Sequence, residues 1–429
     1  MEPLSERVPV EIWLEIFEHL PRSTDLHGLS VSCRRFNELT ARALRRDVVW
    51  HRAKHVAHDL DVWEDNLGIE SAVRSLVLGV SRLPGSLYSG TIERDGRTVM
   101  RGDPRVIAPA GLGGPGAPDR VSLHIVDNSF AASSLLAPMW EKIMAFTNIS
   151  TLTFANMFVL PEHFTLIHSL VQLRNLRLDT CAICPRAPHN PPTHVSLPIT
   201  ELTLYNIRRA TRAPIQQGPG GHDDITYTLS LCVAQGLRRL KVDATADVFR
   251  FVYGAWDAQA RGWSIPAGLE HLYVKKGVVG VERPSLFVAD HAFPDTHLYH
   301  FCVQAKSLRT VSTPIFVPTQ VAIAPEALPL GLERFCAPLD TAQLVAGARR
   351  LKALGLLKCG VGAREGITAL ASIGASSPEL EMLLVEFKGW DGEIFSAAAQ
   401  LFKGLRRLKV VYEGPGPSEV RHQVPGSYA

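Results

Sequence analysis

The sequence has few cysteines for its length, and their spacing gives no sign of pairing. Its 429 residues include seven cysteines, which are scattered from Cys33 to Cys359. An odd and dispersed set does not build the disulfide framework of a small secreted domain. We therefore expect reduced thiols and a cytoplasmic or nuclear protein.

Long apolar runs are also missing. No stretch approaches the roughly 18 consecutive apolar residues of a membrane span. Glu11, Glu15 and Glu18 interrupt the first apolar stretch, and a secretion signal does not tolerate such charges. The sequence therefore predicts a soluble chain without a signal peptide and without a membrane partner.

Charge of one sign is not in excess. The formal net charge is only +3, which is close to neutral for a chain of this size. A general nucleic-acid binder needs a concentrated basic face, so we expect no nucleic-acid partner. With 46% hydrophobic and 20% charged residues, the composition is that of a foldable globular protein.

Motifs of catalysis are absent as well. The sequence contains no Gly-x-Ser-x-Gly elbow, no phosphate-binding Gly-Lys-Ser/Thr loop and no His-Glu-x-x-His helix. We therefore expect a protein that is not an enzyme and that carries no cofactor.

Two groups of residues have the chemistry of metal ligands. Cys181-x-x-Cys184, followed by His189 and His194, has the ligand types of a zinc site. The segment is shorter than in a zinc finger and is stiffened by prolines. Cys181 also occupies the same position of a repeated phrase as Cys359, so we interpret it as a core cysteine.

The second group is His51, His55 and His58, whose spacing places them on one side of a helix. No carboxylate lies between His51 and His58 to orient these imidazoles as a second layer of ligands, and the first to follow are Asp59 and Asp61. An exposed helix between two domains explains their spacing, and we predict no metal site.

The most informative stretch that is present lies in the first forty residues. Pro9 suits the first position of a helix, where its missing N–H costs nothing. Ile12, Ile16 and Leu20 recur every fourth residue, with Phe17 beside them, and form a wide apolar stripe. The segment is too short to bury this stripe by itself. An external partner or the rest of the chain must cover it.

The spacing of this segment resembles the F-box, a small helical module that docks on the Skp-type adaptor of cullin ubiquitin ligases. The resemblance covers residues 5–52. Gly28 is a departure that weakens the second helix. The shared features are the Val8-Pro9 opening, Glu11, Ile16-Phe17, Leu20, Asp25-Leu26, Leu29, Cys33-Arg34-Arg35-Phe36 and Trp50. The adaptor contacts that the resemblance implies are Pro9, Ile12, Ile16, Phe17, Leu20, Leu26, Leu29 and Phe36.

A short phrase, Leu-x-x-Leu-x-Leu, recurs through the rest of the chain. It begins at Leu173 and again at Leu351, with a cysteine three residues after the last leucine in both cases. The frame recurs between residues 149 and 405 at intervals of about 28 residues, which is the period of leucine-rich repeats. Helical patterns lie between the phrases. The predicted fold class is α/β, with a three-helix N-terminal module followed by a right-handed α/β solenoid whose inner sheet is parallel.

We expect four segments along the chain. They are the F-box at 5–52, a linker helix at 53–72, a degenerate solenoid at 73–413 and a disordered tail at 414–429. Stretches rich in Gly and Pro predict loop insertions at 84–119, 184–198 and 209–224.

Alternation along each strand directs every second residue away from the core. In the middle phrases these residues are basic or aromatic, which suits an acidic or phosphorylated peptide. The alternative is an ordinary solvated sheet face. The predicted target-binding residues are Arg177, Tyr205, Arg239, Lys241, His271, Tyr273 and Lys275. In the later phrases, Ala353, Gly355, Leu357, Met382 and Leu384 make the same face apolar.

The resemblance implies a substrate receptor of an SCF-type ubiquitin ligase, which acts by positioning a target protein and supplies no catalytic group. Its expected partners are a Skp-type adaptor, a cullin reached through that adaptor, and an unknown target protein. Two alternatives remain open. One is an interaction scaffold that does not cause degradation, and the other is a leucine-rich-repeat protein whose N-terminal helices only cap the solenoid.

Overall fold

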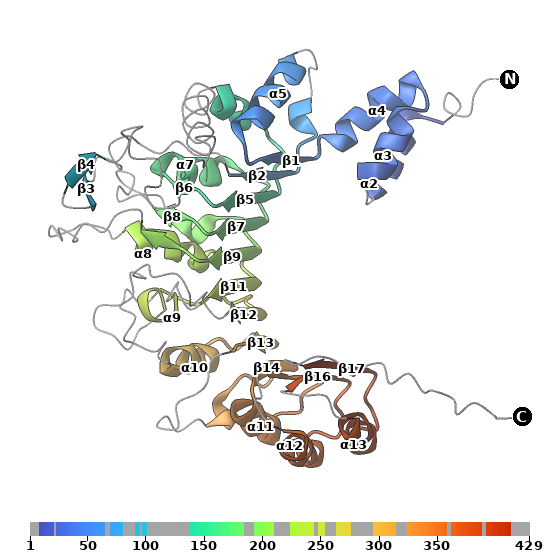
Figure 1. The fold of residues 1–429 in the computed structure, drawn as a ribbon, viewed down its shortest axis with the longest axis vertical. Coiled ribbons are helices and arrows are strands. Elements are labelled where there is room, and N and C mark those ends of the chain that lie inside the picture. Colours follow the sequence, from blue (N-terminus) through green and yellow to red (C-terminus); the bar gives the residue numbers. More distant parts are fainter. Residues whose placement is uncertain are drawn as a thin grey trace, which may run out of the picture. The chain divides into compact units, whose positions relative to one another are not determined.

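A computed structural model describes most of the chain in two compact units, Met1–Thr228 and Leu229–Ala429 (Figure 1). The described residues are 8–20, 23–64, 69–79, 91–94, 97–100, 138–183, 193–209, 224–243, 248–253, 263–275, 295–314, 324–357, 362–387 and 392–412. The predicted phrase at residues 123–128 and the predicted tail at 414–429 lie outside these ranges.

The first unit begins with three helices, α2 (Val10–His19), α3 (Ser23–Ser30) and α4 (Arg34–Leu44). The carbonyl of Pro9 accepts hydrogen bonds from the first turn of α2, as expected for a proline at a helix start. The Cys33 side chain caps α4 by accepting the backbone N–H of Phe36, over 3.4 Å. Local sequence signals therefore set both helix starts.

Parallel strands follow the helices in the first unit, in the order β1-β2-β5-β7-β9. The second leucine of each phrase aligns with its counterpart, so that Leu76, Leu152, Leu176 and Leu202 form one buried row. The strands are β1 (Asp47–Trp50), β2 (Ser75–Leu78), β5 (Thr151–Ala155), β7 (Asn175–Asp179) and β9 (Glu201–Tyr205). Between them lie α5 (Ala53–Glu64), η1 (Ile69–Ser71), a helix at 138–144, α7 (Pro161–Ser169) and η4 (His194–Ser196), and α8 (Asp224–Leu229) follows β9.

Strand β1 is a repeat that the sequence did not reveal. Trp50 was expected to close the helical module, but it lies in β1, is fully buried and stacks against Trp63 with centroids 5.6 Å apart. Because β1 pairs with β2 in register, the sheet begins inside the predicted 5–52 segment. The predicted linker helix is α5, which follows β1 as a repeat helix follows its strand.

The first unit also contains a second, smaller sheet. It has the order β10-β8-β6 and is parallel, with strands β6 (Phe158–Val159), β8 (Ala182–Ile183) and β10 (Arg208–Arg209). Each of these short strands follows a strand of the main sheet after two residues, and the first of the two has positive φ. These residues are Asn156, Thr180 and Asn206, at φ of 55°, 58° and 50°. A tight left-handed turn at the same place in successive repeats thus joins the two sheets.

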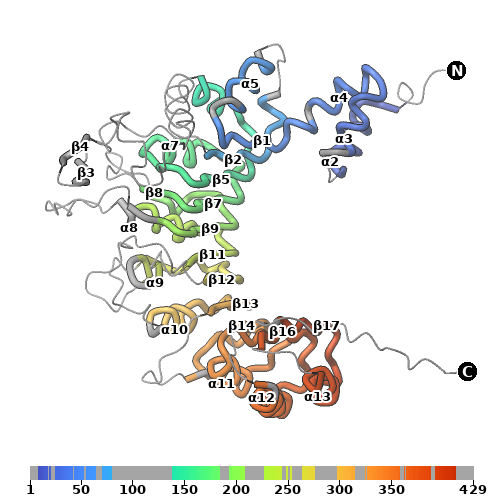
Figure 2. Tube along the Cα trace, viewed as in Figure 1, coloured from blue at the N-terminus to red at the C-terminus, as the bar shows by residue number. Residues whose placement is uncertain are grey.

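The second unit continues the pattern with strands in the order β11-β12-β13-β14-β15-β16-β17. In the Cα trace each strand follows its predecessor in sequence order (Figure 2). The strands are β11 (Arg239–Asp243), β12 (His271–Lys275), β13 (Thr310–Ser312), β14 (Arg334–Pro338), β15 (Ala353–Leu357), β16 (Met382–Phe387) and β17 (Arg407–Tyr412). The helical segments are η5 (Ser230–Val233), α9 (Val248–Phe251), α10 (Asp295–Gln304), η6 (Pro325–Ala327), α11 (Leu339–Ala348), α12 (Ala363–Ser376) and α13 (Glu393–Leu401).

The phrase residues form the core of both units. Leu240, Leu272, Val311 and Leu354 are all buried in the second unit. Burial fades at β17, where Leu408 is only half-buried. Helices α11, α12 and α13 lie side by side and cover one side of the last strands, so the other side of that sheet carries the alternate residues (Figure 1).

Two of the predicted loop insertions contain regular structure. Within 84–119, β3 (Thr91–Arg94) and β4 (Arg97–Met100) form an antiparallel hairpin, and the rest lies outside the described residues. Within 184–198, η4 is a 3-10 turn, and residues 184–192 lie outside the described ranges. Of 209–224, only Arg209 and Asp224 are described.

Candidate functional site

The N-terminal helices divide their apolar side chains between a core and an exposed stripe. Trp13, Phe17 and Phe36 form the core, with the Phe36 ring 4.7 Å from Trp13 and 5.7 Å from Phe17 between centroids. Phe17 is only 1% exposed. By contrast, Ile12 is 51% and Ile16 is 42% exposed, and their spacing of four places them on one face of α2.

The predicted adaptor contacts therefore fall into three groups. Pro9, Ile12 and Ile16 are exposed, whereas Leu20, Leu29 and Phe36 are half-buried. Phe17 and Leu26 are buried within the module, at 1% and 5% exposure. Their role as adaptor contacts stays a prediction. A stripe spaced for helix packing has the same period whether it faces a partner or a neighbouring helix.

Two exposed apolar residues were missed. Val10 is 38% exposed beside Ile12, and Val31, directly after α3, is 85% exposed. Val31 lies in a turn, where side chains follow no regular spacing, so the sequence pattern could not predict its exposure. We call Val10, Ile12, Ile16 and Val31 the exposed apolar set of the N-terminal module.

A buried cluster of histidines lies on the helical side of the first unit. The Nε2 atom of His194 is 3.1 Å from the carbonyl of Tyr227, so it carries the proton and donates. The Nδ1 atom of His194 must then accept, and it lies 3.0 Å from Nε2 of His168, which donates. His163 accepts the backbone N–H of Leu160 at its Nδ1 atom, over 3.0 Å. Because His163 and His194 each accept a hydrogen bond at Nδ1, these two imidazoles are held in the neutral form.

The electrostatics of the cluster agree with its geometry. Burial lowers the pKa of His163 to about 4. Burial, together with the neighbouring His168, lowers the pKa of His194 to about 3. Both side chains are therefore neutral at physiological pH and serve as hydrogen-bonding core groups.

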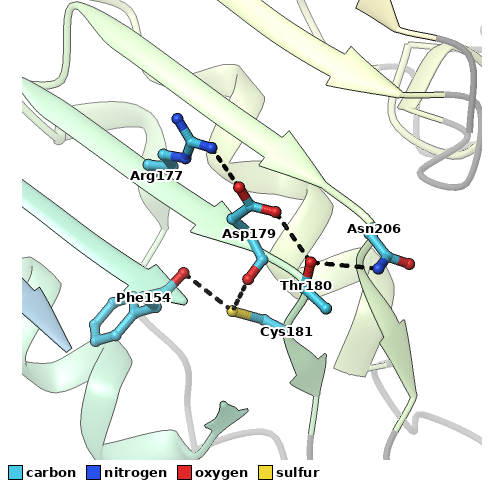
Figure 3. A network of polar contacts seen from close by, with 6 residues as sticks. All are labelled: Phe154, Arg177, Asp179, Thr180, Cys181 and Asn206. Carbon is cyan, nitrogen blue, oxygen red and sulfur yellow. Dashed lines mark hydrogen bonds and ion pairs between the residues drawn. The ribbon is translucent and has the colours of Figure 1, made fainter. Parts of the chain in front are cut away.

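Arg177, one of the two target-binding residues predicted for the first unit, lies in a polar network with Asp179, Thr180 and Asn206 (Figure 3). Arg177 forms an ion pair with Asp179, and its guanidinium lies 5.8 Å from the centroid of the Tyr205 ring. Thr180 donates to Asp179 over 3.0 Å and accepts from Asn206 over 3.3 Å. Arg177 and Tyr205 thus meet, but the charge of Arg177 is already matched by a carboxylate.

Cys181 belongs to the same network. Its side chain is fully buried and donates to the carbonyl of Phe154 over 3.3 Å (Figure 3). This confirms the interpretation of Cys181 as a core cysteine that satisfies the backbone between repeats. Cys184 and His189 lie outside the described residues, and His194 is engaged with His168.

The other histidine group lies where α5 begins. His51, His55 and His58 are all exposed. Within the described ranges of the chain, no three His, Cys, Asp or Glu side chains are placed to hold a metal ion.

In the second unit the sheet register groups the outward residues into rows that cross the strands. The first row is Arg239, His271, Thr310, Arg334, Ala353, Met382 and Arg407. The second row is Lys241, Tyr273, Ser312, Cys336, Gly355, Leu384 and Lys409. Neither row contains a carboxylate, and we call them the acid-free rows.

The acid-free rows include most of the predicted target-binding residues. Arg239, Lys241, His271 and Tyr273 lie half-buried on adjacent strands β11 and β12. Lys275 is exposed at the end of β12, next to Asp243 in register. Sequence reasoning missed Arg334 on β14, because its phrase is degenerate.

A row of alternating charge borders the acid-free rows. Each member directly precedes a strand, and the backbone N–H of one member donates to the carbonyl of the previous one over 2.8–2.9 Å. The Nζ atom of Lys352 lies 3.1 Å from Oε1 of Glu333, and Nη1 of Arg406 lies 3.9 Å from Oε2 of Glu381. We call this row the charge ladder: Arg238, Glu270, Arg309, Glu333, Lys352, Glu381 and Arg406.

The fold and the surfaces define a protein-interaction molecule built from a helical module and a solenoid of parallel strand–helix repeats. Residues 5–53 match the sequence model of the F-box-like family. With the repeat register, this match confirms the predicted combination of an F-box with leucine-rich repeats. No curated protein matches the chain.

Solved leucine-rich-repeat structures are distantly similar. One is an internalin (inlF) from Listeria monocytogenes, with 14% identity, a TM-score of 0.30, and coverage of 64% of this chain and 78% of that one. Another is the leucine-rich repeat-containing protein LegL7 from Legionella pneumophila, with 10% identity, a TM-score of 0.35, and coverage of 84% and 90%. Because both TM-scores are low, the fold class rests on the strand register itself. Among the described residues, no helix has the length and apolarity to cross a membrane.

Proposed function

We propose that the chain is the substrate-recognition subunit of an SCF-type ubiquitin ligase. In this role the F-box-like module binds a Skp-type adaptor, which links the chain to a cullin, and the solenoid holds a target protein. The observation that carries the proposal is the exposed apolar set on a module that matches the F-box-like family. Exposed apolar side chains grouped on one small module are typical of a protein interface.

The mechanism in this proposal is positioning. A target held near a ubiquitin-charged enzyme reacts as if its effective concentration were raised, and the receptor contributes no reacting group. This fits the two parts of the chain, because one carries an apolar docking surface and the other carries a polar sheet face.

The proposal is tested by adaptor binding of the full chain with a double substitution, Ile12→Ala with Ile16→Ala. Truncating two partly exposed isoleucines removes apolar contact area without opening the aromatic core. We expect adaptor binding to weaken about tenfold or more, which corresponds to about 1.4 kcal/mol or more. The measurement is titration of the purified adaptor by calorimetry.

Val171→Ala is the matched control, because Val171 is 70% exposed and lies in a turn outside the N-terminal module. Unchanged adaptor affinity in the double variant, with wild-type helicity, would count against the F-box docking surface. Loss of helicity in the double variant would favour the alternative in which the helices only cap the solenoid.

Degradation is a separate part of the proposal and needs its own readout. Partners captured from cells by the Ile12/Ile16 variant should accumulate, since they are bound but not delivered to the ligase. If captured proteins keep the same turnover with the wild type and the variant while adaptor binding differs, the chain is a scaffold that does not cause degradation.

A further inference from the structure

The last repeat of the second unit leaves part of its apolar phrase uncovered. In the repeat before it, the three phrase residues are at most 2% exposed: Leu380, Leu383 and Val385. The corresponding residues of the last repeat, Leu405, Leu408 and Val410, are only half-buried. Among the described residues no strand follows β17 in the sheet, so the neighbour that would bury this phrase is missing there.

Strand β17 also has an open backbone edge within the described part of the sheet. It pairs in parallel with β16, and the backbone N–H of Arg407 donates to the carbonyl of Glu381 over 3.1 Å. Successive residues of a strand direct their backbone groups to opposite edges, so those of Leu408 and Val410 point away from β16. The same two residues thus offer main-chain hydrogen bonds and half-buried apolar side chains at one edge.

The side chains of β17 restrict how a second copy of the chain could pair with it. Antiparallel pairing around a two-fold axis perpendicular to the sheet keeps the core sides of both copies together, and it uses the backbone groups at positions 408, 410 and 412. A register centred on Leu408 places Arg407 opposite Lys409. A register centred on Lys409 places that residue opposite its own copy. Both registers oppose like charges, which is unfavourable.

The register centred on Val410 has no such conflict. It places Val410 opposite its own copy, and Lys409 opposite Val411, which is 37% exposed on the outward face. Arg407 then lies opposite Glu413, the residue that follows β17 in the sequence. Two-fold symmetry repeats this pair of opposite charges at both ends of the contact. In this register the edge of β17 is therefore complementary to itself in charge and in apolar surface.

The register centred on Val411 is less complementary. It pairs Lys409 with Glu413, but it places Leu408 opposite Gly414, which has no side chain to cover an apolar one. The register centred on Val410 instead places Leu408 opposite position 412 of the second copy. All three edge-directed positions of β17 are then paired within the strand itself.

We propose that two copies of the chain associate through β17, in the antiparallel register centred on Val410, so that the sheet of one second unit continues into that of the other. The inference does not depend on the proposed function, because the exposed apolar set lies in the first unit. The contact is small, so we expect a dissociation constant of about 1–100 μM.

The proposed pairing has a consequence for binding by the dimer. Because the two-fold axis is perpendicular to the sheet, the outward faces of the two sheets lie on the same side. A partner protein that carries two binding segments would contact both copies at once and be held more tightly than by one copy.

Sedimentation velocity of the purified full chain, at about 1–200 μM, measures the association. We expect the sedimentation coefficient to rise with concentration toward that of a dimer. Arg407→Glu places like charges opposite each other at both ends of the contact and should weaken the association about tenfold or more. The double substitution Arg407→Glu with Glu413→Arg restores both pairs and should recover it. Arg364→Glu, at an exposed position on helix α12, makes the same change in net charge and should have no effect.

Hydrogen exchange of single amides locates the contact on the strand. The amides of Leu408 and Val410 should be protected only at concentrations at which the dimer forms. The amide of Arg407 bonds to β16 and should be protected at every concentration. Val410→Pro removes an N–H that points to the open edge and should weaken the association about tenfold, since proline is tolerated where an edge strand has no ladder hydrogen bond to lose.

Several results would overturn the inference. A chain that stays monomeric over the whole concentration range, or an Arg407→Glu variant that Glu413→Arg does not rescue, excludes this contact. Val420→Lys with Val424→Lys changes the apolar residues of the segment 414–429 and should leave the association unchanged. Stronger association of that variant would assign the edge of β17 to this segment of the same chain. If Arg407→Glu lowers the helicity of the chain, the exchange of the wild-type amides decides, and protection that is independent of concentration excludes a second copy.

Discussion

Single residues decide how the N-terminal module divides its apolar surface between a core and an interface. Phe17 and Ile16 are neighbours in sequence, yet one is 1% and the other 42% exposed. A stripe of apolar residues at helical spacing predicts a buried face but not what buries it. Here the rings of Trp13 and Phe36 bury Phe17.

This division predicts that two neighbouring substitutions lower the stability of the module by very different amounts. Phe17→Ala should lower the stability of the module by about 3–5 kcal/mol, because it opens a cavity between two rings. Ile16→Ala should cost less than about 1 kcal/mol, because the side chain is largely in water. Hydrogen exchange of the α2–α4 amides, followed by mass spectrometry, resolves the module from the rest of the chain. Similar protection in both variants would contradict the assignment of core and surface.

The buried histidines make the first unit sensitive to acid. In the folded chain the pKa is about 4 for His163 and about 3 for His194, below the ordinary value of about 6.5 that applies to the unfolded chain. As the pH falls below 6.5, both histidines bind protons in the unfolded chain but stay neutral in the folded chain. The free energy of unfolding should therefore fall by about 1.4 kcal/mol per pH unit for each histidine, until the folded pKa is reached.

The measurement is the pH dependence of hydrogen exchange in α7 and β7. A variant with His163→Gln and His194→Gln should be less stable at neutral pH but should show a smaller loss of stability on acidification. The glutamine oxygen can still accept the backbone N–H that His163 accepts. An unchanged pH dependence would mean that other groups cause the acid sensitivity.

At the scale of elements, the charge ladder adds a register signal to the apolar phrases. The phrases alone recur with the same spacing in every repeat, so they do not distinguish one neighbouring strand from another. Alternating charge placed directly before each strand favours pairing with a neighbour of opposite sign. The ladder thus opposes a slip by one repeat, which would bring like charges together.

Substitution of Glu333 tests whether the ladder acts as a row or as separate pairs. Glu333→Lys should destabilise β14 and β15 by about 0.5–1 kcal/mol at low salt, because it places like charges between Arg309 and Lys352. Exchanging both partners, Glu333→Lys with Lys352→Glu, keeps an ion pair between positions 333 and 352. It also places the new lysine next to Arg309 and the new glutamate next to Glu381, so that like charges are neighbours on both sides. We expect no rescue by the exchange. Full recovery of amide protection would show that the pair acts alone.

Most elements could be predicted from the sequence, since every described phrase leucine at the strand positions lies in the sheet. The signal is strong because a strand buried between neighbours needs apolar residues at fixed offsets. Strand β1 was missed because Trp50 was already assigned to the helical module by the F-box resemblance. The sequence between β3 and β4 is Asp95-Gly96, a pair typical of a two-residue hairpin turn. The hairpin was missed because the whole stretch was interpreted as a loop rich in glycine and proline.

The candidate sites were harder to predict than the fold. Outward positions follow from alternation, so Arg239, Lys241 and His271 could be named in advance. Thr203 and Asp243 occupy outward positions too, yet they are 5% and 4% exposed, because neighbouring side chains cover them. The pairing of Arg177 with Asp179 and the positive φ of Thr180 depend on the turn that follows the strand. Alternation carries no information about that turn.

At the scale of the whole molecule, the chain combines two kinds of surface that differ in chemistry. The exposed apolar set lies in the first unit, and the acid-free rows lie in the second. Within the described residues, each is formed by a single unit and needs no contribution from the other. Substitutions at one surface are therefore expected to leave binding at the other unchanged.

The charge ladder also affects how copies of the chain meet. It has basic members at both of its ends, Arg238 and Arg406. Strand β17 is the last strand of the described sheet, and an edge strand is a template on which other chains can pair. Two copies that approached through β17 in parallel register would bring Arg406 against Arg406. We expect the repulsion between these like charges to disfavour pairing of two copies at β17 in that register.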